Sequence, residues 1–262
     1  MHLRSLAYRT DLALLELAGS EVEDRGTHLV VRTPQNPTFY WGNYLLLAQP
    51  PAAEGVEHWL ETFEREFPEA RHRTFGVDGT DGSTADLAAF EGAGFEVEGS
   101  TVLTARSVHA PPRPNTEAVV RPLEGDHDWA QQLELSLAGE DEHYTSEFAT
   151  RRTSAQRLTT EAGHGQWFGA FLDGRLASSL GIFSASEGLA RFQQVKTRPT
   201  ARGRGLCGTL VHAASRYAFE ELGAETLVMV ADPDYVAIRV YRSVGFEGTE
   251  TQLAAIRLPA TP

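Results

Sequence analysis

A glycine- and arginine-rich stretch at residues 195–210, VKTRPTARGRGLCGTL, is the part of this chain best suited to chemistry. A strand is expected to end near Thr197, and a long helix follows the glycines. A glycine-rich turn before a helix leaves backbone N–H groups without partners, and these donors and the helix dipole bind phosphate oxygens. Lys196 and arginines 198, 202 and 204 add local positive charge. The stretch therefore predicts a phosphate-binding turn; the alternative is a tight turn with arginines facing solvent.

A second candidate stretch covers residues 232–247. Asp232-Pro-Asp234 follows an expected buried strand, and a short helix then ends at Gly245-Phe246. Tyr241 lies on that helix, and its hydroxyl favours a functional residue, because Phe would serve equally well in a core. The alternative interpretation is a core aromatic residue on an amphipathic helix.

Together the two stretches resemble the GNAT superfamily of N-acetyltransferases. The family's pyrophosphate loop has the pattern [RQ]-x-x-G-x-[GA], which reads here as Arg202, Gly205 and Cys207, with the small cysteine in place of glycine or alanine. The family's later motif has an Asn, then a Tyr, then Gly-Phe, and here these are Asp234, Tyr241 and Gly245-Phe246. The resemblance covers about residues 166–258.

The resemblance implies an acetyl-CoA-dependent N-acetyltransferase that moves the acetyl group to a primary amine by direct transfer through a tetrahedral intermediate. A strand amide around Val195 to Thr197 would polarise the thioester carbonyl, and Tyr241 would protonate the leaving thiolate. The implied residues around the coenzyme are Val195, Lys196, Thr197, Arg202, Gly203, Arg204, Gly205, Leu206, Cys207, Gly208, Thr209 and Asp234.

The general base is not identified by the resemblance. Family members often carry a Glu on one of two strands, but neither 189–197 nor 226–231 contains a carboxylate. Candidates are Glu140, Asp141, Glu142 and His143 in an acidic loop, or a water relay helped by Gln193. Cys207 as a nucleophile is the weaker interpretation of that residue. The histidines show no metal-ligand spacing, so no metal is expected.

Composition limits the other possibilities. The chain has 262 residues, of which 41% are hydrophobic and 23% charged, as in ordinary globular proteins. A net charge of −13 argues against binding to nucleic acid or to anionic lipid. No apolar run is long enough for a membrane span, and Asp11 and Glu16 interrupt any signal peptide. With one cysteine, Cys207, the expected location is the cytoplasm.

The proline-rich stretch 109–116, HAPPRPNT, predicts a linker between a domain at 1–110 and a domain at 111–262. Residues 81–96 align with 232–247 without gaps, and Phe90 falls on Tyr241. This echo suggests a tandem repeat with a degenerate GNAT-like first half. The first half has two prolines where the loop donors would be, so one acetyl-CoA per chain is expected, in the second half.

The predicted fold class is α/β, with a mixed central sheet and helices on both faces. In the second half we expect a hairpin over 166–183, strands at 189–197 and 226–231, a long helix between them, and a last strand at 249–258 that closes this half. A non-catalytic acyl-CoA-binding or ligand-sensing module is the alternative function. The expected partner is a small-molecule or peptide amine, and the chain is expected to be a monomer with paired domains or a homodimer.

Overall fold

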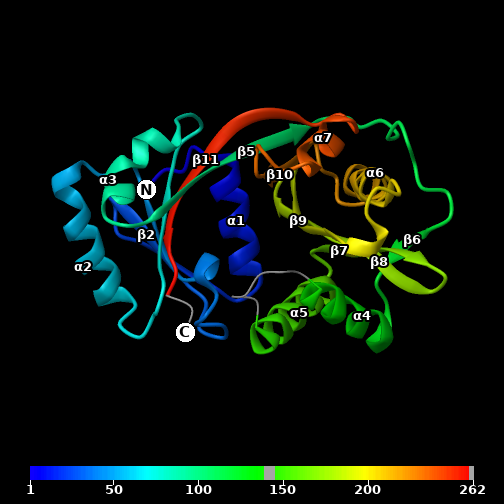
Figure 1. Cartoon of the computed structure of the whole chain (residues 1–262), viewed down its shortest axis with the longest axis horizontal. Coiled ribbons are helices and arrows are strands. Elements are labelled where there is room, and N and C mark those ends of the chain that lie inside the picture. Colours follow the sequence, from blue (N-terminus) through cyan, green and yellow to red (C-terminus); the bar gives the residue numbers. More distant parts are fainter. Residues whose placement is uncertain (139–144, 260–262) are drawn as a thin grey trace. The chain divides into compact units, whose positions relative to one another are not determined.

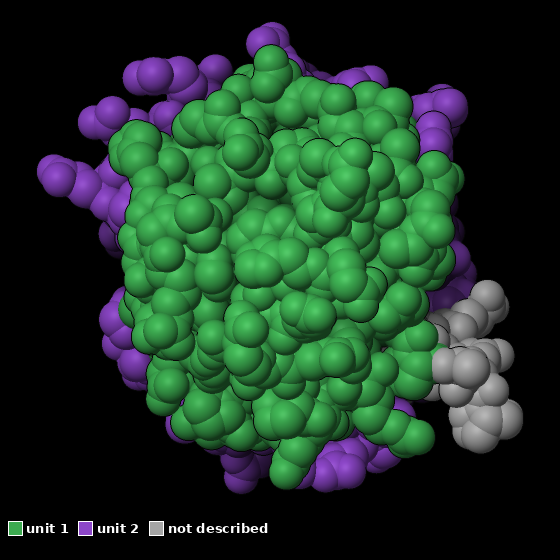
Figure 2. All heavy atoms as spheres, turned by 90° about the vertical axis from the view of Figure 1, so that its left-hand side faces the viewer, with its two compact units in different colours: residues 1–102, 230–233, 249–262 green, residues 103–229, 234–248 purple. Residues whose placement is uncertain are grey.

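The computed structural model describes residues 1–138 and 145–259. The chain forms two compact units, which are described separately (Figures 1 and 2). Unit 1 contains Met1–Val102, Val230–Pro233 and Thr249–Pro262, and unit 2 contains Leu103–Met229 and Asp234–Gly248. The first boundary lies between residues 102 and 103 instead of at residue 110, and unit 1 also contains residues 230–233 and the C-terminal strand.

Unit 1 consists of a mixed sheet with helices on its two faces. The strand order is β1-β2-β3-β4-β11-β5. The elements in chain order are α1 (Leu6–Leu17), β1 (Glu21–Asp24), β2 (His28–Arg32), β3 (Tyr44–Leu47), α2 (Val56–Glu66), β4 (Arg73–Val77), α3 (Ala88–Gly92), most of β5 (Glu96–Ala105) and most of β11 (Glu247–Arg257).

Two neighbouring residues of β4 show how the helices cover both faces of this sheet. Phe75 is stacked on Phe90 of α3, with ring centroids 4.8 Å apart, and also packs against Phe63 of α2. The next residue, Gly76, points to the opposite face, where a Cβ would lie 2.6 Å from the Tyr8 hydroxyl of α1. Because successive strand residues face opposite sides, α2 and α3 cover one face and α1 the other.

The C-terminal strand belongs to unit 1, contrary to the expectation that it closes the second half. β11 pairs antiparallel with β4, from Leu253 opposite Val77 to Arg257 opposite Arg73. The Tyr8 hydroxyl donates to the Leu253 carbonyl at 2.6 Å. The side chain of Leu253 lies in the same apolar cluster as Phe75. The expectation was wrong because an apolar strand pattern shows that a strand exists but does not identify its partner.

Unit 2 carries the two candidate stretches. Its strand order is β10-β9-β8-β7-β6. The elements are β6 (Val119–Pro122), α4 (Gly125–Leu137), α5 (Ser146–Glu161), β7 (Gly165–Leu172), β8 (Arg175–Ser186), β9 (Leu189–Thr197), α6 (Leu206–Glu220), most of β10 (Thr226–Ala231) and α7 (Ala237–Arg242).

The sheet of unit 2 is also covered on both faces. Asp173 and Gly174 have φ values of 49° and 76° and form the tight turn expected between β7 and β8. Trp167 of β7 faces Trp129 of α4, while its neighbour Phe168 packs edge-on against Tyr217 of α6 at 5.2 Å. Figure 1 shows α4 and α5 on one side of the strands and α6 on the other. The predicted mixed sheet with helices on both faces is confirmed.

The two units have the same internal strand pattern. In unit 1, β1–β2 and β2–β3 are antiparallel and β3–β4 is parallel across α2. In unit 2, β7–β8 and β8–β9 are antiparallel and β9–β10 is parallel across α6. Both α3 and α7 are followed by a glycine with positive φ, Gly94 (82°) and Gly245 (117°), and then by a buried phenylalanine. The echo seen in the sequence therefore corresponds to equivalent segments of two similar units.

Candidate active site

The loop between β9 and α6 presents a row of unused backbone donors. Gly203 and Gly205 have φ values of 74° and 76°, a conformation that favours glycine. Gly205 is the N-cap of α6 and no side chain caps the helix. In the described part of the chain, the N–H groups of residues 203–208 have no hydrogen-bond acceptor. The loop therefore offers amide hydrogens and a positive helix end to an anion.

These donors border a cavity of about 470 Å³. A volume of this size is typical of small-ligand pockets, which range over roughly 300–1,000 Å³. The lining comes from four segments: Pro111, Pro112 and Arg113; Val195, Lys196 and Thr197; Ala201, Arg202, Gly203, Gly205, Leu206, Cys207 and Gly208; and Tyr235, Val236, Ala237, Val240, Tyr241 and Ser243.

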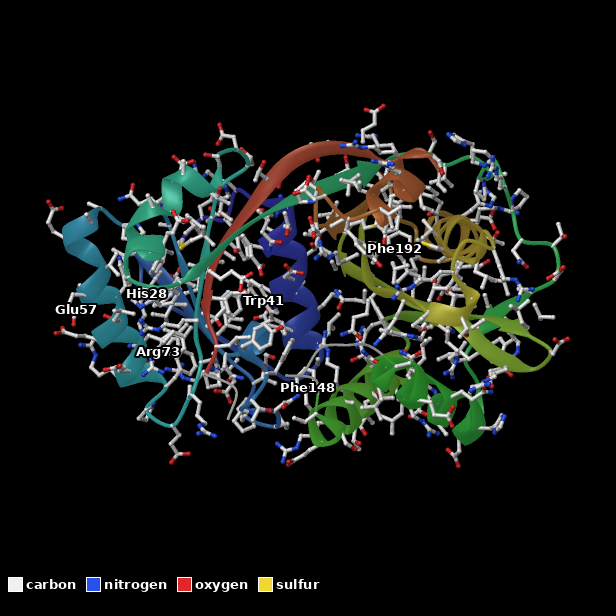
Figure 3. All side chains as sticks on the ribbon, in the orientation of Figure 1. His28, Trp41, Glu57, Arg73, Phe148 and Phe192 are labelled. Atoms are coloured by element: carbon white, nitrogen blue, oxygen red, sulfur yellow. The ribbon has the colours of Figure 1, made fainter. Side chains whose placement is uncertain are left out.

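The strand that leads into the loop carries a β-bulge. Ser179 of β8 pairs with Lys196, whereas Gly181 pairs with Gln193, so residues 194 and 195 together oppose one residue of β8. Gln194 has a φ of 43°, which is unusual for a non-glycine residue. A bulge takes backbone groups out of the ladder. Below it, Phe192 (labelled in Figure 3) packs edge-on against Phe246 at 5.7 Å and anchors the strand beside the segment that follows α7.

Most of the positive charge near the loop is already engaged. The Lys196 ammonium donates to the Ser136 carbonyl at 2.5 Å. Arg198 donates to the Leu176 carbonyl at 2.6 Å and pairs with Glu134. Arg204 pairs with Glu117 at 2.5 Å. Arg202, by contrast, lines the cavity and has no ion-pair partner among the described residues.

Tyr241 brings a phenol to the same cavity. Its side chain is only 5% exposed, and in the described part of the chain its hydroxyl makes no hydrogen bond. Burial raises the pKa of Tyr241 well above its ordinary value of 10. The phenol therefore stays protonated across the physiological range and is available as a proton donor.

Cys207 is a half-buried thiol that lines this cavity. Burial raises its pKa to about 12, so the thiolate is scarce at neutral pH despite the nearby helix N-terminus. The cavity environment therefore favours the small-residue interpretation of Cys207 over the nucleophile.

The structure brings together most, but not all, of the sequence-predicted residues. Arg204, Thr209 and Asp234 lie outside the lining of the cavity. The Thr209 hydroxyl instead donates to the Gly205 carbonyl and accepts from the Asn115 N–H. The base candidates Glu140, Asp141, Glu142 and His143 lie outside the described residues. Gln193 contacts Arg152 at 3.5 Å and is not part of the cavity lining.

Sequence reasoning missed one wall of the cavity, the proline-rich segment that it interpreted as a connector. Pro111, Pro112 and Arg113 line the cavity. The Arg113 carbonyl lies so close to the loop that a Cβ on Gly205 would be 2.3 Å from it. The sequence signal that could have indicated this wall is Arg113, a charged residue within the otherwise apolar and rigid run Pro-Pro-Arg-Pro at 111–114. Among the described residues that line this cavity there is no carboxylate and no imidazole.

Comparisons with known proteins agree with this geometry. The model of the Acetyltransferase (GNAT) family matches residues 130–246, a range that contains β9, the glycine loop and Tyr241. Residues 130–246 form a domain of the GNAT superfamily. No curated protein matches the sequence.

Solved structures with the same fold extend over nearly the whole chain. A GCN5-related N-acetyltransferase from Kribbella flavida is 16% identical, with a TM-score of 0.67, and the match covers 96% of this chain and 95% of that one. A functionally unknown conserved protein from Staphylococcus epidermidis is 10% identical, with a TM-score of 0.71 over 92% and 95% of the two chains. A tandem GNAT protein from the clavulanic acid biosynthesis pathway is 17% identical, with a TM-score of 0.54 over 83% and 74%. At these identities the likeness shows the fold, and one of the three proteins is described as a tandem GNAT protein.

Two further findings concern the described residues only. None of their helices has the length and apolar character needed to cross a lipid bilayer. They also contain no cluster of three His, Cys, Asp or Glu side chains arranged to hold a metal ion.

Proposed function

We propose that this chain is an N-acetyltransferase that uses acetyl-CoA and acetylates a primary amine on a small molecule or peptide. The observation that carries the proposal is the combination of unused N–H groups at residues 203–208 and the unbonded Tyr241 hydroxyl in one cavity. The first feature fits a diphosphate and the second fits a thiolate leaving group.

The residues present fit coenzyme A. The unused N–H groups and Arg202 would hold the diphosphate, and the apolar lining from Val236, Ala237 and Val240 suits the pantetheine chain. When bound, acetyl-CoA would supply an acetyl group activated as a thioester.

The bulged strand would position and polarise the reacting carbonyl. The bulge places Gln194 and Val195 opposite a single residue of β8, which would leave a backbone amide outside the β8–β9 ladder, and Val195 lines the cavity. A fixed N–H donor of this kind stabilises negative charge that develops on a carbonyl oxygen. This role was expected for an amide between Val195 and Thr197, and the bulge favours Val195.

Tyr241 would hold a proton for the departing thiolate. A phenol in a mostly apolar cavity, with a pKa above 10, stays protonated, so its O–H can donate to the sulfur as negative charge develops on the leaving thiolate. Phe90 stands at the matching place in unit 1, fully buried and stacked on Phe75, with no hydroxyl.

Unit 1 is proposed to be a degenerate GNAT-like unit that does not bind coenzyme A. The helix equivalent to α6 is α2, and its N-cap Gly55 has a φ of −91° instead of a left-handed value. Two prolines precede α2. Glu54 lies in a short 3-10 helix, Ala53–Gly55, just before α2, and Glu57 lies in the first turn of α2. Fewer amide donors and added negative charge both disfavour a phosphate.

A non-catalytic acyl-CoA-binding or sensing module is the second candidate. The observation that favours it is the lack of a carboxylate or imidazole among the described lining residues, because an ammonium substrate must lose a proton before it attacks. If the chain is instead a transferase, the proton of the ammonium substrate must be taken up through a water relay or by a group elsewhere in the chain.

Incubation with acetyl-CoA and a panel of primary amines separates the two candidates. Release of free thiol together with an amine product heavier by one acetyl group supports the transferase. Saturable acetyl-CoA binding with no thiol release across the panel supports the sensing module, and absence of binding refutes both.

A further inference from the structure

The proline-rich segment 109–116 is fastened to the glycine loop. The Asn115 N–H donates to the Thr209 hydroxyl at 2.8 Å, and the Asn115 side-chain amide donates to the Arg204 carbonyl at 2.9 Å. Glu117 then pairs with the Arg204 guanidinium. These contacts, and the close approach of the Arg113 carbonyl to Gly205, hold the segment in one place at the rim of the cavity.

Arg113 is therefore a cation on a segment whose backbone is held beside the glycine loop. It lines the cavity, its side chain is exposed, and in the described part of the chain it has no ion-pair partner. Arg202 is the other guanidinium that lines the cavity without such a partner. The two residues come from segments far apart in the sequence, and both line the cavity in a chain whose net charge is −13.

Two free guanidinium groups match the two separate phosphate groups of coenzyme A. The molecule carries a diphosphate in its chain and a phosphate monoester on the ribose 3′ oxygen. The N–H groups of residues 203–208 and Arg202 would bind the diphosphate. Arg113 is then available for the phosphate monoester on the ribose. A guanidinium binds a phosphate monoester through paired N–H donors with both geometric and charge complementarity.

We propose that Arg113 binds the 3′-phosphate of coenzyme A, so that the proline-rich segment 109–116 of unit 2 is part of the coenzyme site. This inference rests on the proposed function, because it assumes that coenzyme A occupies the cavity. Arg113 would then make the affinity for coenzyme A higher than the affinity for analogues that lack the 3′-phosphate.

Calorimetric titration of the full chain with coenzyme A and with 3′-dephospho-coenzyme A tests the assignment. Arg113→Gln should weaken coenzyme A binding about five- to tenfold, the effect of one partly exposed charge-assisted contact, and change 3′-dephospho-coenzyme A binding less than about twofold. Arg113→Lys should recover part of the loss. Arg106→Gln is the matched control, since Arg106 is exposed in the preceding segment and lies outside the cavity lining.

Two results would overturn the assignment. One is an Arg113→Gln variant that binds coenzyme A as tightly as the wild type. The other is an equal loss for both ligands, which would place Arg113 on the diphosphate. Thermal unfolding of each variant checks that the fold is kept. If the wild type binds neither ligand, the proposed function itself fails, and that outcome is distinct from a failure of the Arg113 assignment.

Discussion

The role of Tyr241 gives the sharpest mutational prediction. Replacing Tyr241 with Phe removes only the hydroxyl, which makes no hydrogen bond in the described protein, and keeps the buried ring. The free energy of unfolding should therefore change by less than about 0.5 kcal/mol. Acetyl-CoA affinity should also be nearly unchanged, because the phosphate contacts that we propose are made by the glycine loop and Arg202.

Turnover is expected to respond very differently. Loss of a general acid lowers kcat by roughly 10²- to 10⁴-fold, which corresponds to about 2.7–5.4 kcal/mol in activation free energy. The pH profile adds a second readout. Burial raises the pKa of Tyr241 above 10, so this group is protonated at every lower pH and should cause no alkaline loss of kcat below roughly pH 10.

The assay is thiol release from acetyl-CoA with the best amine of the panel, accompanied by a calorimetric measurement of acetyl-CoA affinity. Tyr235→Phe is the matched control, because Tyr235 lines the same cavity but is 51% exposed, and it should retain activity. A Tyr241→Phe variant with the kcat of the wild type would remove Tyr241 from the mechanism. Equal losses in both variants would also refute a specific role for it.

Three further predictions follow from the fold. Gly205→Ala should lower the free energy of unfolding by about 2–4 kcal/mol, because the new Cβ would lie 2.3 Å from the Arg113 carbonyl at a φ of 76°. Gly203→Ala is the control, since it has open space around it, and it should lower the free energy of unfolding by only about 1 kcal/mol. Equal urea unfolding midpoints for the two variants would contradict this prediction. Ending the chain after residue 248 removes residues 249–257 of β11 and should unfold unit 1, which would be seen as lost amide protection in β4. A β4 that stays protected would show that unit 1 does not need β11. Native mass spectrometry should find one acetyl-CoA per chain, and two would show that unit 1 also binds it.

The sequence predicted the structure best where a feature depends on local chain geometry. The loop at 202–208 and Tyr241 were both located from short patterns, because a left-handed glycine, a helix start and a Gly-Phe helix end are encoded within a few residues. The Asp173-Gly174 turn was found for the same reason.

The features it missed depend on contacts between distant segments. Nothing in the sequence of 249–258 shows that this strand pairs with β4, because strand partners are set by the assembled sheet. The proline run at 111–114 has the composition of a free linker, and its contact with Gly205 is tertiary. Arg204 and Lys196 looked like phosphate ligands, yet Glu117 and the Ser136 carbonyl engage them. A side chain's charge is evident from the sequence, but its direction is not.

The most direct test of the central claim is hydrogen–deuterium exchange of the full chain with and without acetyl-CoA. The account predicts that the amides of residues 203–208, which have no acceptor in the described protein, become protected when acetyl-CoA binds. The equivalent region of unit 1, the first turn of α2, should exchange at the same rate in both samples. Unchanged exchange at 203–208 in the presence of saturating acetyl-CoA, or protection confined to α2, would contradict the account.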